Sequence, residues 1–202
     1  MRIGTGLRLV AMTVLLLAVN GITSGQQNVA PTGTSDIPPL KLSSAAFSDS
    51  TPYPHKYTCI ADPNVIKRGL GTSPPLQWSE VPPNTAIFVL IFHDLEPRLA
   101  KSSEDYVHWI MWNLPGTARE LPEGIPPNPE LPDGTRQGHN DGGQVGYRAP
   151  CAGPSLPHHY TFELFAVDQK LDLAPTATRA DVLKAINGHT LGHAVLIGLF
   201  HR

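Results

Sequence analysis

Three segments that lie far apart in the sequence carry side chains suited to holding a small anion. These segments are His93-Asp94-Leu95-Glu96, Val107-His108-Trp109, and Gly146 to Cys151 continuing to His158-His159-Tyr160. Imidazole N–H groups can donate to phosphate oxygens, and a neighbouring carboxylate fixes the tautomer and favours the protonated ring. The turn at Ala149-Pro150-Cys151 can add backbone N–H donors, which would come from Cys151 and its neighbours because proline has none. Together the segments predict one pocket.

The acidic side chains of these segments suggest what else the ligand carries. Asp94 and Glu96 would complement an amine or accept from a hydroxyl, so a zwitterionic phosphoethanolamine-type head group fits the mixed lining. Each residue alone also has a purely structural interpretation. A histidine beside Trp in an apolar strand usually donates to a backbone carbonyl, and an aspartate at a strand end usually forms a turn. The prediction of a site therefore depends on all three segments meeting.

Short apolar runs separated by Pro- and Gly-rich connections must position these residues. Strands are expected over residues 86–92, 107–113, 160–167 and 194–200, and 21 prolines indicate long ordered loops. The proline-rich stretch 114–132 is expected to be a connector and not a helix. This pattern predicts a mainly β fold, a β-sandwich of antiparallel strands within one domain.

One short helix is expected near the C-terminal end. Thr178 can cap it, Asp181 stands three residues on as in a capping box, and Gly188 can end it. Its apolar stripe would consist of Val182, Leu183 and Ile186.

Side-chain alternation divides the candidate residues between the two faces of their strands. In a regular strand, His108 would share a face with Ile110 and Trp112, opposite Val107, Trp109 and Met111. By the same rule His158 and Tyr160 share a face while His159 turns away, so only one of these two imidazoles is expected in the pocket.

Cys59 and Cys151 are the only cysteines. In an oxidising compartment an even number is compatible with a disulfide, and two separate thiols are the alternative. A bridge would close a loop of roughly 90 residues and could contribute up to about 4 kcal/mol in the chain-entropy model. It would stiffen the pocket mouth.

The N-terminal residues have the layout of a secretory signal peptide, with Arg2 and Arg8, an apolar stretch over 9–19, and small polar residues up to Gly25. We expect a signal peptide at 1–25, a flexible linker at 26–40 and one domain at 41–202. The apolar stretch falls short of the roughly 20 residues of a membrane span, although an uncleaved anchor is the alternative. The protein is therefore expected to be secreted or periplasmic, with no stable membrane span after cleavage.

Charge and motif content exclude several function classes. Removing residues 1–25 takes away two arginines and no acid, so the formal charge moves from −2 to −4, and no basic patch remains for nucleic acid. His189 and His193 stand four apart, but Gly188 and Gly192 disfavour the continuous helix that a zinc pair would need. Ser73 lacks a Gly-x-Ser-x-Gly elbow, and Asp133-Gly134-Thr135 has only a superficial likeness to an aspartic-protease triplet. We expect no metal, no cofactor and no catalysis.

The same motifs resemble those of the phosphatidylethanolamine-binding protein family, in its bacterial Raf kinase inhibitor-like branch. Thr72 to Trp78 is similar to the early Ser-Pro-Pro-Leu-x-Trp signature, and residues 188–202 resemble the helix-to-strand ending of the family. The resemblance runs from about Phe47 to Arg202. It implies a Greek-key-like β-sandwich that serves as a binding scaffold. It also implies a ligand site lined by Asp94, Glu96, His108, Ala149, Pro150, His158 and Tyr160.

The chain departs from the family pattern at the pocket itself. The usual Asp-Pro-Asp-Ala-Pro reads Asp94 to Arg98 as Asp-Leu-Glu-Pro-Arg, and Ala149 replaces a glycine before the turn proline. The double proline after the cysteine is replaced by Ala152-Gly153. A further insertion, residues 65–71, precedes the Ser-Pro-Pro motif and could reshape the rim.

Two functional hypotheses from different classes follow. The first is an exported protein that binds a small anionic or phosphoethanolamine-like ligand through His108, His158 and the turn. The second is an inhibitor module that meets a protease through exposed loops, either 65–71 or 122–132, as relatives are described as inhibitors of kinases or serine proteases. A kinase target does not fit an exported protein.

Overall fold

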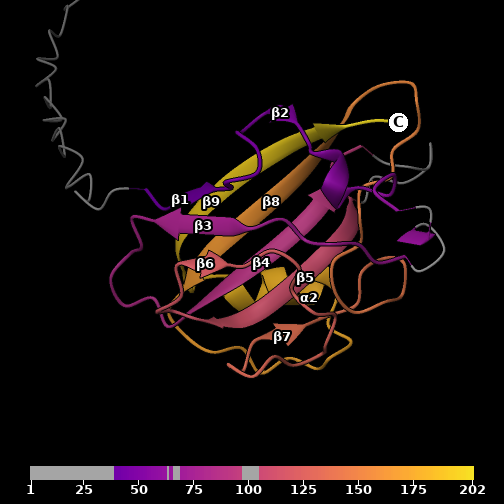
Figure 1. Ribbon diagram of the computed structural model, residues 1–202. Coiled ribbons are helices and arrows are strands. Elements are labelled where there is room, and N and C mark those ends of the chain that lie inside the picture. Colours follow the sequence, from indigo (N-terminus) through magenta and orange to yellow (C-terminus); the bar gives the residue numbers. More distant parts are fainter. Residues whose placement is uncertain (1–38, 63, 66–68, 97–104) are drawn as a thin grey trace, which may run out of the picture. The chain divides into compact units, whose positions relative to one another are not determined.

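Two β-sheets and a short helix make up the described part of the chain (Figure 1). The structure is a computed structural model, and it describes residues 39–62, 64–65, 69–96 and 105–202. The predicted signal peptide and all but the last two residues of the predicted linker lie outside the described residues. Among the described residues, no helix has the length and apolar character of a transmembrane span.

The larger sheet has six strands in the order β2-β9-β8-β4-β5-β7. Its strands are β2 (Thr51–Pro52), β9 (Thr190–Phe200), β8 (His158–Val167), β4 (Ile87–Asp94), β5 (Tyr106–Pro115) and β7 (Arg136–Gln137). Neighbouring strands are antiparallel except β2 and β9, which are parallel. The four long strands cover the four predicted ones, apart from Ala86, and pair in antiparallel fashion, as the sequence predicts.

The smaller sheet has the order β1-β3-β6 and lies over one face of the larger sheet (Figure 1). Its strands are β1 (Lys41–Ser43), β3 (Leu76–Ser79) and β6 (Glu120–Leu121), and a 3-10 turn, η1 (His55–Tyr57), follows β2. The predicted connector 114–132 contains no helix, although the end of β5 and the two residues of β6 lie within it. The predicted mainly β sandwich with one short helix near its C-terminal end is confirmed.

The core has two parts, one on each face of the larger sheet. The first lies between the sheets, where Trp78 of β3 meets Phe88 of β4 with ring centres 5.3 Å apart. The second lies beneath helix α2 (Arg179–Ile186) and includes Val89, Ile91 and Val182. All eight residues of β4 are buried because both of its faces are covered, which explains the unbroken apolar run of this strand up to His93.

Helix α2 begins and ends as the sequence predicts. The Thr178 side chain accepts from the backbone N–H of Asp181, and the Asp181 carboxylate accepts from that of Thr178, which forms a capping box. Val182 and Ile186 are buried against the larger sheet, and Gly188 adopts a φ of +83° just beyond the helix. Such a φ favours glycine, so the helix ends there for a steric reason.

A β-bulge in β5 overturns the predicted alternation at His108. Trp109 pairs with Phe92 and Val107 pairs with His93, so His108 is an extra residue between two consecutive pairs. Val107 consequently joins the core beneath α2, whereas the His108 ring packs against Phe92 and Tyr160 on the opposite face. Because of the bulge, His108 points to the side of the sheet on which Asp94 and His158 lie.

Candidate functional site

A cavity of about 250 Å³ opens where β4 ends and β8 begins. In the antiparallel register Asp94, the last residue of β4, lies opposite Tyr160 of β8, which brings distant sequence segments together. The bulged start of β5 adds His108. The residues that line the cavity are Asp94, Glu96, His108, Arg148, Cys151, Ala152, Gly153, His158 and Tyr160.

Asp94 and His158 form a buried pair in this cavity. Asp94 Oδ2 lies 2.7 Å from His158 Nδ1, and Oδ1 accepts from the backbone N–H of Glu96 at 3.0 Å. The Asp94 side chain is 2% exposed and that of His158 is 18% exposed. Burial raises the pKa of Asp94, although the hydrogen bond from His158 opposes the rise. As the carboxylate accepts at Nδ1, Nε2 is the nitrogen that His158 has available for a ligand.

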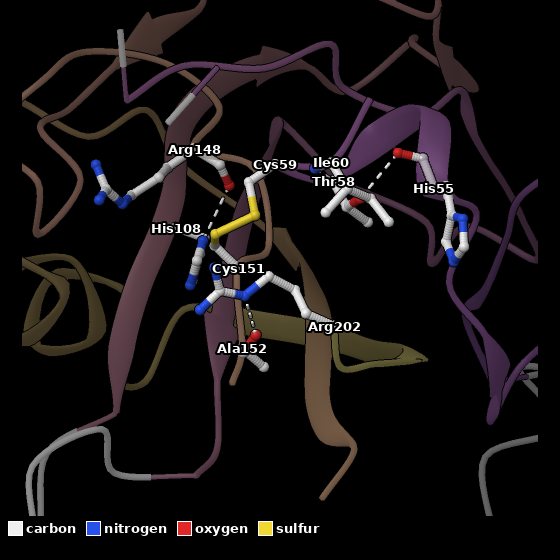
Figure 2. The surroundings of a disulfide bond; sticks show 9 residues. All are labelled: His55, Thr58, Cys59, Ile60, His108, Arg148, Cys151, Ala152 and Arg202. Carbon is white, nitrogen blue, oxygen red and sulfur yellow. Dashed lines mark hydrogen bonds between the residues drawn. A yellow bond between two sulfur atoms is a disulfide. The ribbon is translucent and has the colours of Figure 1, made fainter. Parts of the chain in front are cut away.

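His108 is oriented in a similar way by the main chain. Its Nδ1 lies 2.9 Å from the carbonyl oxygen of Arg148, as Figure 2 shows. A carbonyl oxygen can only accept, so the hydrogen is on Nδ1, and Nε2 of the neutral ring carries a lone pair. His108 therefore has the structural carbonyl bond expected of a buried histidine and also lines the cavity.

Glu96 lines the cavity while it is held by His159. Its carboxylate accepts from the backbone N–H of His159 at 2.6 Å and contacts Nδ1 of the same residue. Burial would raise the pKa of Glu96, but the hydrogen bonds from the His159 side chain and backbone lower it on balance. His159 itself does not line the cavity, in agreement with the predicted alternation at His158 and Tyr160.

The turn that follows Arg148 contributes different residues from those expected. Ala149 and Pro150 are buried and do not line the cavity, because Ala149 packs into the core and the Pro150 carbonyl accepts from Cys59 N–H at 2.9 Å. Cys151, Ala152 and Gly153, the three residues that follow, form one wall of the cavity, which we call the lip. The cavity-lining part of the turn is thus shifted toward the C-terminus.

A disulfide fastens the lip. Cys59 and Cys151, 92 residues apart, are joined, so the pairing left open by the sequence is present in the structure (Figure 2). Tyr160 lines the cavity beside the lip, and burial together with the Asp94 carboxylate raises the pKa of its hydroxyl.

Arg148 is a lining residue that the sequence did not single out. Its guanidinium carbon lies 5.8 Å from the centre of the Tyr106 ring, a cation–π distance. Nothing in the strand pattern identifies it, because it belongs to an irregular segment. Its backbone carbonyl, which orients His108, is the part with a clear role at the cavity.

Three lining residues could hold a metal ion by geometry, since Asp94, Glu96 and His158 offer ligand atoms within 4.8 Å of one another. Their oxygens, however, already accept the hydrogen bonds described above, and a metal ion would have to displace those bonds. The histidine pair considered and disfavoured as a zinc site from the sequence, His189 and His193, does not converge on one point. His189 contacts Asp168 and His193 contacts Glu163, so the two imidazoles have separate partners.

Comparisons with known proteins give consistent results. A family model described as phosphatidylethanolamine-binding protein matches residues 43–201. A UPF0098 protein of Methanothermobacter thermautotrophicus is 42% identical over 163 residues, which is 81% of this chain and 99% of that protein. A crystal structure of the putative homologue CT736 from Chlamydia trachomatis has a TM-score of 0.68 at 33% identity, covering 81% of this chain and 98% of that one. The crystal structure of Escherichia coli YbcL has a TM-score of 0.70 at 25% identity and covers 82% and 99% of the two chains.

Proposed function

We propose that this chain, which belongs to the phosphatidylethanolamine-binding protein family, binds a small phosphate-type anion in the cavity between β4, β5 and β8. The observation that carries the proposal is the shared orientation of two imidazoles. His108 and His158 both line the cavity, and each has its Nδ1 occupied by an oxygen of the protein. Their Nε2 atoms are then the groups that can donate to an anion when the rings are protonated.

The size and charge of the cavity support a head group as the ligand. A volume of about 250 Å³ is below the range of roughly 300–1,000 Å³ that is typical of pockets for drug-sized ligands. Phosphate or phosphoethanolamine suits this space better than a whole lipid. The partly exposed Glu96 carboxylate at the wall would complement the amine of phosphoethanolamine.

We further propose that binding is the whole activity, without catalysis, in a secreted or periplasmic protein. Among the described residues no serine lines this cavity, and its one cysteine is bonded in a disulfide. The disulfide suits an oxidising compartment. Inhibition of a protease through exposed loops stays the alternative prediction, and residues 66–68 of one of those loops lie outside the described residues.

Titration with inorganic phosphate and with phosphoethanolamine tests the proposal. We expect chemical-shift changes at the His108 and His158 ring protons, and tighter binding as the pH falls through the range in which imidazole protonates, because each ring gains a second donor. His158→Ala should weaken binding about tenfold, the loss of one charge-assisted hydrogen bond. His189→Ala is the matched control, since His189 is paired with Asp168 and does not line the cavity. No response at millimolar ligand in the unsubstituted protein would refute the proposal.

A further inference from the structure

An anion in this cavity needs a positively charged group nearby, and the residue that supplies it is not evident from the cavity lining alone. Among the residues that the structure describes, two carboxylates, Asp94 and Glu96, face the cavity, and Arg148 is the one lining residue with a permanent positive charge. The imidazoles contribute charge only when protonated. A doubly charged phosphate would therefore meet net repulsion unless a guanidinium reaches it.

The guanidinium of Arg148 lies against Tyr106 and Gly142, on the side away from His108. The group lies over the Tyr106 ring, and its Nη1 atom is so close to Gly142 that a Cβ there would be 2.2 Å away. Figure 2 shows this side chain extending away from His108 and from the disulfide. The positive charge of Arg148 therefore lies next to Tyr106 and Gly142.

Arg202 is attached to the lip instead. Its Nε donates to the carbonyl oxygen of Ala152 at 3.0 Å, and its backbone N–H donates to that of Gly153 at 3.3 Å. In Figure 2 the guanidinium extends toward Cys151 and Ala152, the opposite of Arg148. Arg202 is exposed, and its two terminal nitrogens make no hydrogen bond to any residue that the structure describes.

We propose that Arg202 is a ligand-binding residue of this cavity, whose terminal guanidinium nitrogens hold the oxygens of a phosphate monoester at the lip. The inference rests on the anion-binding function proposed above and deepens it. A guanidinium fixed at Nε keeps its remaining donors in one plane, which suits two phosphate oxygens. It supplies a charge that does not vanish when the imidazoles lose their protons. Phosphates with two negative charges are consequently the preferred ligands.

Calorimetric titration with inorganic phosphate at pH 8 tests this role with three variants. Arg202→Gln should weaken binding about fivefold or more, which is the loss of an exposed charge-assisted contact. Arg202→Lys should recover at least half of the lost affinity, since the charge is restored. Arg119→Gln is the matched control and should stay within about twofold of the unsubstituted protein, because Arg119 is exposed and does not line the cavity. Thermal unfolding of the Arg202 variants should be unchanged, because the side chain is exposed.

Salt provides a second readout that a merely structural role would not change. Raising the ionic strength should weaken phosphate binding by the unsubstituted protein more than by Arg202→Gln, because charge pairs at the surface are screened. Equal binding by Arg202→Gln and the unsubstituted protein would overturn the assignment, as would an equal loss in Arg119→Gln or no recovery in Arg202→Lys. Absence of phosphate binding in the unsubstituted protein would instead reject the proposed function itself.

Discussion

The two faces of the larger sheet use the same residue types to different ends. His93 and Asp94 are neighbours on β4 and point to opposite faces, and each belongs to a histidine–carboxylate pair. On the α2 side, His93 has Asp105 at 3.0 Å from Nδ1 and Glu163 at 3.2 Å from Nε2, so both ring nitrogens are next to acids. On the cavity side, Nδ1 of His158 meets the Asp94 carboxylate, and Nε2 has no carboxylate next to it among the described residues.

The pKa values of the carboxylates on the two faces are shifted in opposite directions. Burial would raise the pKa of Glu163, but His93, Arg179 and His193 lower it on balance. Burial raises the pKa of Asp94, and its one imidazole partner does not reverse the shift. The Glu163 carboxylate, with three basic groups around it, stabilises the folded state at neutral pH. The Asp94 carboxylate, with one imidazole partner, lowers the stability of the folded state at that pH. The two histidines therefore differ at the second ring nitrogen: Nε2 of His93 lies next to the Glu163 carboxylate, whereas His158 lines a cavity.

The largest effect on stability is expected from removing the disulfide that fastens the lip, because the described residues on the α2 side contain no disulfide. Replacing both cysteines, Cys59→Ala with Cys151→Ala, should lower the free energy of unfolding by about 4 kcal/mol, because the bridge closes a loop between residues 92 apart. Denaturant unfolding with and without reductant measures this. The double variant should be insensitive to reductant, and a loss below about 1 kcal/mol would contradict the expectation.

A smaller loss is expected on the α2 side. Glu163→Gln should reduce the free energy of unfolding at pH 7 by about 2 kcal/mol, since it leaves His93 and Arg179 short of a charged partner in a partly buried cluster. Because the pKa of Glu163 is lowered in the folded state, its ionised carboxylate stabilises the fold at pH values above the ordinary glutamate pKa. This contribution is lost as the pH falls through the folded-state pKa. The variant and the unsubstituted protein should therefore converge in acid. Phosphate affinity should stay the same, as Glu163 does not line the cavity.

The smallest change in stability, and one of opposite sign, is expected for Asp94→Asn. A raised pKa in the folded state costs stability above the ordinary aspartate range, so removing the charge should leave the protein equally stable or up to about 1 kcal/mol more stable at pH 7. Phosphate affinity should nevertheless fall about threefold, because the carboxylate that orients the His158 ring through Nδ1 is gone. Denaturant unfolding at pH 4 and pH 7 measures the sign. Destabilisation at pH 7 equal to that of Glu163→Gln would erase the contrast between the two faces.

Local sequence signals determined the elements and most of the site. The apolar run before His93 predicts a strand covered on both faces, and Thr178 with Asp181 predicts the start of α2, since these patterns depend only on neighbours in the chain. The family motifs placed five residues that do line the cavity, Asp94, Glu96, His108, His158 and Tyr160.

The tertiary structure decided what depends on pairing between distant segments. The face of His108 follows from a bulge in the register of β4 and β5, which a period of two cannot foresee. The lip is formed by residues 151–153 and not by Ala149 and Pro150, because strand ends and a disulfide set the path of an irregular turn. The directions of Arg148 and Arg202 depend on Tyr106 and Ala152, partners that lie 42 and 50 residues away in the chain. Side-chain alternation and helix capping depend on residues that are close in sequence, so they can be predicted locally. The cavity is formed by contacts between segments that are distant in sequence, so only the tertiary structure defines it.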